Sequence, residues 1–529
     1  MANHISLRIW LFNLFLIGAA LLPISHSSPS HYGFQSKAKA KPLTTQSDFK
    51  VRGANLGGWL VIEGWIHPSN FDGIPNGDFL DGTTLQLKSV TTKKYLCADA
   101  GGGDYVAASC DDKCGWEKFR LWRINENTFQ IRVPKDQFLG IDGTQVVAVV
   151  VDPTDEENFE IIRGSKDPNR VRIKASNGYY LQAKSEKEVM ADGPKDSDWG
   201  DNDPTVFELT ILSQINGDWQ LQNGWGPKAA QVMQNHYDTF IVEDDFKFMS
   251  ENGINAVRIP VGWWTIYDPN PPFPFVSGTL KALDNAFSWA KKYGLKVILD
   301  LHSAPGSQNG VAHSTTRDGS LEWGKTNETI QQTLEVIDFY AARYAKHENL
   351  YGFELLNEPL YPYVSLKTVE EYYRLAYKVV RHYNPTVYVI FATRLSFTRD
   401  DVPSYLELSP LVNSFENSVL VINWYSLFYD TFTNFTAKDH IEYVKVERNR
   451  QMTKLLENNQ QARIYIGEWS CGWDAENPTE EDLKEFAKAK MEVYDRATFG
   501  WTFWTFKNVQ NNWSMKWLIE NGYIDLLHR

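Results

Sequence analysis

The stretch Phe353-Glu354-Leu355-Leu356-Asn357-Glu358-Pro359 is an apolar run that ends in a carboxylate, and the proline after it stops a strand. Seven other apolar runs have the same character: 51–63, 256–260, 296–302, 387–392, 419–425, 463–468 and 500–506. After the first run, helical segments such as 228–252, 280–293 and 329–347 separate them. Such runs are typical of a parallel sheet covered by helices, and eight βα units close into a barrel. The sequence therefore predicts an α/β fold, a (β/α)8 TIM barrel.

A second pattern interrupts this barrel after its first strand. Residues 85–211 show short alternating strands and Gly or Asp turns, without helical periodicity. Three internal echoes start near Lys88, Phe129 and Val171, and each ends in an aromatic strand. Three units of four short strands predict an inserted all-β trefoil, which resembles the fascin-like trefoil. We expect the insert at 83–212 and the barrel at 49–82 and 213–529.

The N-terminus predicts secretion. Residues 1–28 place a charged start before a short apolar core and a polar exit, as in a signal peptide, with a retained membrane anchor as the alternative. Residues 29–48 read as a flexible lead-in. Glycosylation sequons begin at Asn327, Asn434 and Asn512, which fits an extracellular protein, of the apoplast or cell wall if the source is a plant.

The net charge and the cysteines limit the kinds of partner and ligand that we expect for this protein. The net charge is −13 and no basic cluster is present, which argues against a nucleic-acid partner. No segment after the leader is apolar and long enough to cross a membrane. Cys97, Cys110 and Cys114 lie close together and permit one bridge, whose pairing the spacing leaves open, while Cys471 lies far away. Metal-like ligand spacing is lacking, so we expect neither a metal nor a cofactor.

Polar residues gather at the predicted strand ends, where barrels of this type carry their function. They are Glu63, Arg258, His302, Asn357, Glu358, Tyr425, Glu468 and Trp504. Glu358 on strand 4 and Glu468 on strand 7 would face each other across the barrel. Two such carboxylates suit glycoside hydrolysis, in which one protonates the leaving oxygen and the other attacks or activates water. The structural alternatives are a surface Glu358, a hydrogen-bonded structural His302 and a core Trp504.

Motifs along the whole barrel resemble those of glycoside hydrolase family 5. They are the sequences at 53–60, 258–260, 299–310, 356–359, 467–469 and 503–504. Within that family the chain is similar to the exo-β-1,3-glucanases, in a secreted plant-type form with a fascin-like insert. The resemblance implies a retaining β-glycoside hydrolase acting on β-glucan.

The resemblance also implies individual roles. Glu358 would be the acid/base and Glu468 the nucleophile, with carboxylates about 5–5.5 Å apart in a retaining enzyme. The remaining roles are Arg258 holding Glu468 ionised, Tyr425 orienting it, Asn357 binding the sugar 2-hydroxyl, His302 bonding in the glucose pocket, Trp504 forming the pocket floor and Glu63 binding sugar hydroxyls.

Two positions depart from the family pattern. Asn423 stands where relatives usually have a histidine, so the sugar contact there changes. Val311 replaces one phenylalanine of a two-aromatic clamp, while Phe428 remains for the other side. Both changes affect the leaving-group side of the site.

Two classes of function follow. The leading prediction is a monomeric, secreted β-glucan hydrolase, an exo-acting glucan 1,3-β-glucosidase. Within enzymes, a β-mannanase or endo-β-1,4-glucanase is the alternative, and outside them a non-catalytic carbohydrate-binding protein. The insert would emerge on the catalytic face, where it would wall the cleft or bind glucan; the alternative is a folded spacer.

Overall fold

The computed structural model of the protein describes residues 49–111, 114–194 and 198–528. The predicted signal peptide, 1–28, and lead-in, 29–48, lie outside the described residues. Within the described part of the chain, no helix is both long and apolar enough to cross a membrane.

Eight parallel strands form a closed barrel, which confirms the predicted fold class. Their order around the barrel follows the chain, and the last strand pairs with the first. The strands are β1 (Val51–Asn55), β14 (Ala256–Gly262), β15 (Lys296–Ser303), β16 (Leu350–Glu354), β17 (Tyr388–Ala392), β18 (Ser418–Asn423), β19 (Arg463–Trp469) and β20 (Gly500–Phe503).

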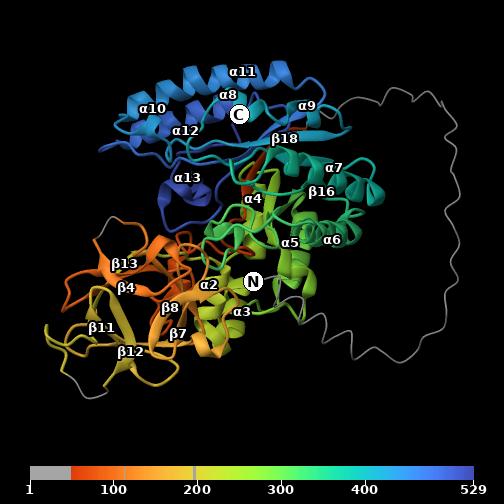
Figure 1. Ribbon diagram of the computed structural model, residues 1–529. Coiled ribbons are helices and arrows are strands. Elements are labelled where there is room, and N and C mark those ends of the chain that lie inside the picture. Colours follow the sequence, from red (N-terminus) through yellow and green to blue (C-terminus); the bar gives the residue numbers. More distant parts are fainter. Residues whose placement is uncertain (1–48, 112–113, 195–197, 529) are drawn as a thin grey trace, which may run out of the picture. The chain divides into compact units, whose positions relative to one another are not determined.

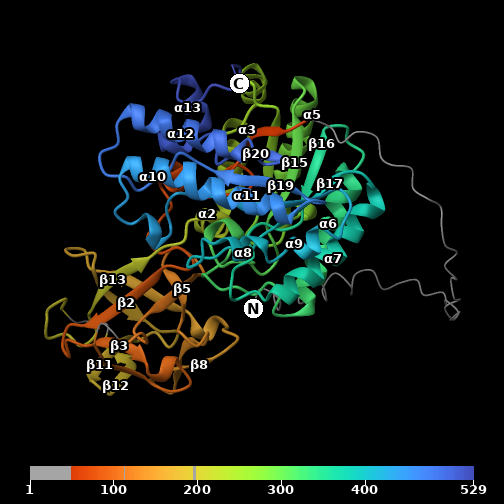
Figure 2. The same cartoon turned by 90° about the horizontal axis from the view of Figure 1, so that it is seen from above.

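Helices cover the outside of these strands (Figures 1 and 2). They are α2 (Asp218–Trp225), α3 (Ala229–Thr239), α4 (Glu243–Glu251), α5 (Thr279–Tyr293), α6 (Asn327–Tyr344), α7 (Leu366–Tyr383), α8 (Val402–Leu406), α9 (Ser409–Val412), α10 (Ala437–Tyr443), α11 (Asn449–Asn458), α12 (Glu480–Tyr494) and α13 (Met515–Glu520). The segment 228–252 holds two helices, and the prediction of one periodic segment missed their boundary. There the side chain of Asp245 accepts a hydrogen bond from the N–H of Val242, which starts α4 as a new helix.

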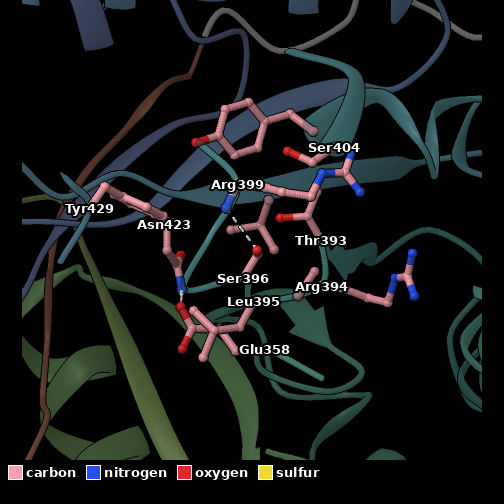
Figure 3. A pocket seen from close by; sticks show the side chains of 12 residues that line it. Glu358, Thr393, Arg394, Leu395, Ser396, Arg399, Ser404, Asn423 and Tyr429 are labelled. Carbon is pink, nitrogen blue, oxygen red and sulfur yellow. Dashed lines mark hydrogen bonds between the residues drawn. The ribbon is translucent and has the colours of Figure 1, made fainter. Parts of the chain in front are cut away.

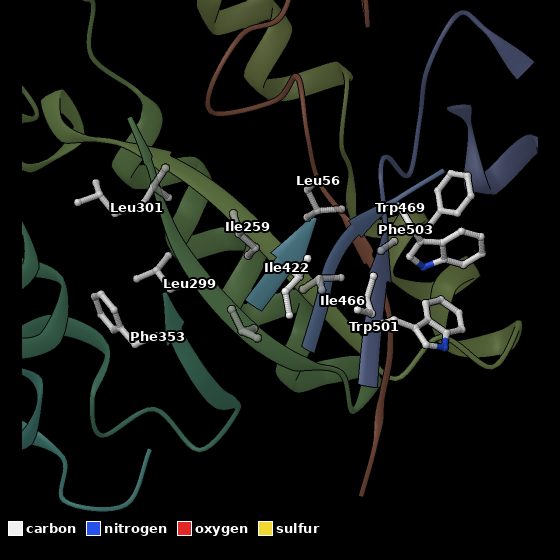
Figure 4. Packing of buried hydrophobic residues seen from close by; sticks show 14 of the residues in the cluster. Leu56, Ile259, Leu299, Leu301, Phe353, Ile422, Ile466, Trp469, Trp501 and Phe503 are labelled. Carbon is white, nitrogen blue, oxygen red and sulfur yellow. The ribbon is translucent and has the colours of Figure 1, made fainter. Parts of the chain in front are cut away.

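Apolar residues of the strands and of the segments just after them pack beneath the covering helices. Leu56, Ile259, Leu299, Phe353 and Ile466 are all at most 1% exposed, and Figure 4 shows where they lie along the strands. Both faces of these strands are buried, which explains why the sequence runs are almost continuously apolar.

The insert is an all-β unit of twelve strands, as predicted. Each predicted echo supplies four of them: β2 (Thr84–Ser89), β3 (Tyr95–Ala98), β4 (Val106–Cys110) and β5 (Phe119–Arg123); β6 (Thr128–Arg132), β7 (Phe138–Asp142), β8 (Gln145–Val150) and β9 (Phe159–Arg163); β10 (Arg170–Lys174), β11 (Tyr180–Ser185), β12 (Glu188–Gly193) and β13 (Phe207–Ser213). The last strand returns to the first, because β13 pairs with β2 from Phe207 opposite Ser89 to Ser213 opposite Thr84.

The structure shows which cysteines pair, a question that the sequence left open. Cys110 and Cys114 form a disulfide inside the all-β unit. Cys97 and Cys471 are buried thiols.

Several barrel strands end earlier than predicted. β16 ends at Glu354, β18 at Asn423 and β20 at Phe503, so Glu358, Tyr425 and Trp504 lie in the segments that follow. Glu63 lies eight residues beyond the end of β1, in an isolated bridge with Gly217. These residues have left the strand ladder, which frees their side chains to turn into a site above the barrel.

Candidate active site

A buried arginine on β14 organises the end of the barrel. Arg258 is fully buried, and its guanidinium donates to Glu354 through Nε and Nη2, at 2.8 and 2.9 Å. Nη2 also lies 3.0 Å from an oxygen of Asp300, and Nη1 donates to Asn55 at 2.9 Å. Arg258 is therefore a shared cation beneath the site, fixed by groups from β1, β15 and β16.

Glu468 receives hydrogen bonds from two sides. Arg258 Nη1 donates to its Oε1 at 2.9 Å, and the Tyr425 hydroxyl donates to its Oε2 at 2.7 Å. Burial raises the pKa of Glu468, and the charge of Arg258 and the hydrogen bond from Tyr425 offset part of this rise. The structure thus gives Glu468 the two contacts that favour its ionised form.

Glu358 has different surroundings. Its Oε1 accepts a hydrogen bond from Asn423 Nδ2 at 2.7 Å (Figure 3). Burial and then the nearby charge of Glu468 raise the pKa of Glu358 to about 8. Its backbone has a φ of +47°, a left-handed conformation that is uncommon for a residue with a side chain. Two neighbouring carboxyl groups therefore differ in environment, and the proton of the pair belongs on Glu358.

Asn357 precedes Glu358 and is also fully buried. Its Oδ1 accepts a hydrogen bond from Arg258 Nη2 at 3.1 Å. Among the described residues nothing accepts a hydrogen bond from its Nδ2. Arg258 thus orients the amide, and its Nδ2 donors have no partner among the described residues.

His302, Trp504 and Glu63 line the same pocket. His302 Nδ1 lies 2.7 Å from Asp300 Oδ2, and its ring stacks on Trp504 with centroids 5.3 Å apart. Burial lowers the pKa of His302 to about 3 and raises that of Glu63 to about 8. Both side chains are therefore neutral near pH 7 and can serve as hydrogen-bonding groups.

Sequence reasoning missed His313, which lies on the loop after β15. Its Nε2 is 3.6 Å from Glu358 Oε2, and its Nδ1 is 3.9 Å from Glu63 Oε2. Asn309 Nδ2 lies 2.8 Å from His313 Nε2 and donates to the carbonyl of Glu358 at 3.1 Å. Asn309 was part of a quoted motif, but no strand-end position marked a histidine four residues further on.

The pocket has a volume of about 460 Å³, within the usual range for small-ligand sites. Of the residues described above, those that line it are Glu63, His302, His313, Glu358, Asn423, Tyr425, Glu468 and Trp504. Its other lining residues are mainly apolar or aromatic: Trp65, Val311, Leu395, Phe397, Leu427, Phe428, Tyr429 and Trp513, with Ser396 and Gln510. Phe428 is 61% exposed and Phe397 54% exposed, so both offer ring faces to a ligand.

A second, much smaller cavity of about 20 Å³ adjoins the first (Figure 3). The residues that line both are Glu358, Leu395, Ser396, Asn423 and Tyr429. The smaller cavity also has polar side chains from Thr393, Arg394, Arg399, Ser404 and Tyr405. The structure brings all ten predicted site residues to this end of the barrel. Asn423, expected to contact sugar, bonds directly to Glu358.

A (β/α)8 barrel with two buried carboxyl groups of unequal proton affinity, in one pocket beyond the strand ends, defines the class of barrel glycosidases. The chain belongs to glycoside hydrolase family 5: residues 222–510 match the family described as cellulase (glycosyl hydrolase family 5). Residues 76–212 match a domain of unknown function, DUF7910.

Individual relatives agree with this assignment. The probable glucan 1,3-beta-glucosidase A of Aspergillus clavatus is 30% identical over 355 residues, covering 60% of this chain and 82% of that protein. The glucan 1,3-beta-glucosidase of Schwanniomyces occidentalis is 32% identical over 368 residues, with the same coverage. The crystal structure of AoRut is 22% identical, with a TM-score of 0.50, covering 59% of this chain and 89% of that one, which supports the fold.

Proposed function

We propose that this protein is a retaining β-glucan hydrolase, an exo-acting glucan 1,3-β-glucosidase, with Glu358 as acid/base and Glu468 as nucleophile. The observation that carries the proposal is the unequal pair of carboxyl groups. Glu468 is bonded to Arg258 and Tyr425, whereas Glu358 is buried beside that negative charge with a raised pKa. The names of the Aspergillus and Schwanniomyces relatives support the choice of glucan.

The first step follows from this pair. Ionised Glu468 attacks the anomeric carbon while protonated Glu358 gives its proton to the glycosidic oxygen, and the bond to the leaving group breaks. Glu468 is then bound covalently to the sugar, and Glu358, now ionised, can take a proton from water. That water attacks the anomeric carbon, releases Glu468 and returns the proton to Glu358.

Positioning residues complete the proposal. The free amide donors of Asn357 would bind the sugar 2-hydroxyl, while His302 and the neutral Glu63 would bind further hydroxyls. Trp504 would form the apolar floor, and Phe428 would contact the sugar on the leaving-group side. Asn423 would act mainly on Glu358, because its amide already donates to that carboxyl group.

We further propose that the protein is a secreted monomer with a signal peptide at 1–28. The barrel would comprise 49–82 and 213–529, and the insert 83–212. β-Glucan is the expected partner, and neither nucleic acid nor a membrane is expected.

Product analysis tests the function. The protein is incubated with laminarin, cellulose oligomers and mannan, and Glu468→Ala serves as the inactive control. Release of glucose from laminarin supports exo-acting, 1,3-specific hydrolysis. If NMR shows that the glucose first released is the β-anomer, the reaction is retaining. Internal cleavage of cellulose or mannan would favour the endo-glucanase or mannanase alternative. Binding without any released sugar would reject catalysis.

A further inference from the structure

The loop between β15 and α6, residues 304–326, belongs to the barrel and also contacts the all-β unit. One half of it contacts the proposed acid/base, and the other half contacts strands of the all-β unit. Apart from a single helical turn at Ala312–Ser314, it has no regular structure of its own. Its shape is held by backbone hydrogen bonds of its turns and by the contacts that its side chains make.

The first half of the loop contacts Glu358. Asn309 donates to the Glu358 carbonyl and lies within hydrogen-bond distance of His313. His313 Nε2 is the ring nitrogen 3.6 Å from Glu358 Oε2, the oxygen that Asn423 leaves free. A small displacement of this loop would therefore change the polar surroundings of the proton-carrying oxygen.

The second half is held by the all-β unit. The carboxylate of Asp318 is buried, and its Oδ2 accepts hydrogen bonds from Trp122 Nε1 at 2.7 Å and Arg132 Nη1 at 2.5 Å. Trp122 belongs to β5 and Arg132 to β6. Next to Asp318, the guanidinium of Arg317 lies 3.9 Å from the centre of the Trp122 ring and donates to Asp81 at 2.7 Å. A buried, charge-assisted contact of this kind is costly to break from one side.

The two halves touch each other through glycines. A Cβ on Gly310 would lie only 2.7 Å from the carbonyl oxygen of Gly319, so the two backbones are in close contact. Gly319 follows Asp318, and Gly310 follows Asn309. The contact with the all-β unit is thus one residue away from a backbone contact that leads directly to Asn309.

We propose that the all-β unit positions the catalytic loop, with Trp122, Arg132 and Asp318 as positioning residues that hold Asn309 and His313 against Glu358. This role differs from both expectations for the insert, a glucan-binding wall and a passive spacer. It rests on the function proposed for Glu358. The titratable groups that interact with Glu358 from outside the loop are Glu468, Glu63, Arg258, Tyr425 and Tyr429, and Asn423 donates a hydrogen bond to it.

Two disrupting variants, one conservative variant and a matched control test the proposal in the full-length protein. Arg132→Met and Asp318→Asn weaken the contact from either side, and Arg132→Lys keeps its charge. The control is Arg172→Met, because Arg172 pairs with Asp203 at 2.6 Å, is at least as buried as Arg132, and has its hydrogen bonds and ring contacts within the all-β unit.

Two measurements are made on each protein: hydrogen–deuterium exchange of peptides from 304–326, and the pH profile of kcat/KM on an aryl β-glucoside. We expect Arg132→Met and Asp318→Asn to raise loop exchange about 10-fold. We also expect them to lower kcat more than KM and to shift the alkaline limb of the profile. Arg132→Lys should have loop exchange and a pH profile of kcat/KM close to those of the unmodified protein. Arg172→Met should raise exchange only in the all-β unit.

The exchange data decide the inference even if no glycoside is cleaved. Unchanged loop exchange in both variants, or an equal change with Arg172→Met, would overturn it. Loop-specific exchange in a protein without hydrolytic activity would leave the positioning role standing and reject the proposed function instead. Loop exchange that rises without any effect on kcat or the pH profile of an active enzyme would overturn the link to Glu358.

Discussion

The barrel mouth and the all-β unit differ in how many arginines pair with their buried carboxyl groups. At the barrel mouth, Glu354, Asp300 and Glu468 share the single cation Arg258, and Glu358 and Glu63 have no cation in hydrogen-bond contact among the described residues. In the all-β unit, Arg172 pairs with Asp203, and Arg132 pairs with Asp318 of the barrel loop.

This difference in pairing distinguishes carboxyl groups that can transfer protons from carboxyl groups that hold the structure in place. A buried carboxyl group with its own arginine stays ionised over a wide pH range, and its role is to fix geometry. A surplus of buried carboxyl groups raises pKa values into the range where protons move near neutral pH. The raised pKa of Glu358 and the lowered pKa of Asp318, about 8 and about 2, are the two sides of this contrast.

The largest effect should come from removing the nucleophile. Glu468→Ala should lower kcat/KM by about 10⁴-fold or more, because the covalent step is lost. Asp203→Asn removes a similarly buried carboxylate from the all-β unit and should change kcat/KM less than about 2-fold. Steady-state kinetics on an aryl β-glucoside measure both. Similar losses in the two variants would break the comparison.

Glu358→Ala should come next, with a loss of about 10²- to 10⁴-fold for a poor leaving group. The loss should be much smaller for a nitrophenyl leaving group, which needs no proton, and added azide should restore turnover as a glycosyl azide. The alkaline limb near pH 8 should also disappear, since it reports deprotonation of Glu358. If that limb persists in the variant, another group titrates there.

The pH dependence of stability should have opposite signs for Glu63 at the barrel mouth and for Asp318, where the loop contacts the all-β unit. Glu63 has a pKa raised from 4.5 to about 8, so its contribution to stability is lost as pH rises between these values. Asp318 has a pKa lowered from 3.8 to about 2, so it stabilises the fold above pH 4, by about 2 kcal/mol, and this is lost as pH falls toward 2.

Urea unfolding of Glu63→Gln and Asp318→Asn across this pH range measures how much each carboxyl group contributes to the free energy of unfolding. Glu63→Gln should reduce the loss of stability between pH 5 and 8, and Asp318→Asn should reduce the loss below pH 4. A steeper alkaline loss in Glu63→Gln would contradict the assigned direction.

The smallest effect concerns the pocket mouth. Val311→Phe adds an aromatic ring to the pocket that Phe428 also lines, and should lower KM for a laminari-oligosaccharide about 3-fold. The matched change Phe428→Ala should raise KM by a similar factor, with kcat changed little. If KM for an aryl glucoside shifts as much as that for the oligosaccharide, the effect is not specific to a leaving-group sugar.

Much of the fold was readable from the sequence, because the apolar runs and three echoes report burial over many residues at once. The same runs could not locate strand ends: Leu355 and Leu356 are as buried as Phe353, yet they lie beyond β16. Burial continues past the end of hydrogen-bonded pairing, so hydrophobicity overestimates strand length.

The sequence by itself determined the barrel, the twelve-stranded insert and the carboxylate pair Glu358 and Glu468, because strand periodicity and strand-end motifs are local signals. Only the tertiary structure decided that Asn423 bonds Glu358, that His313 joins the site, and that Asp318 ties the catalytic loop to Trp122 and Arg132. These contacts join residues 45 to 196 positions apart or lie on an irregular loop. Loops carry no periodicity, and the partner of a polar side chain is fixed only when the chain has folded around it.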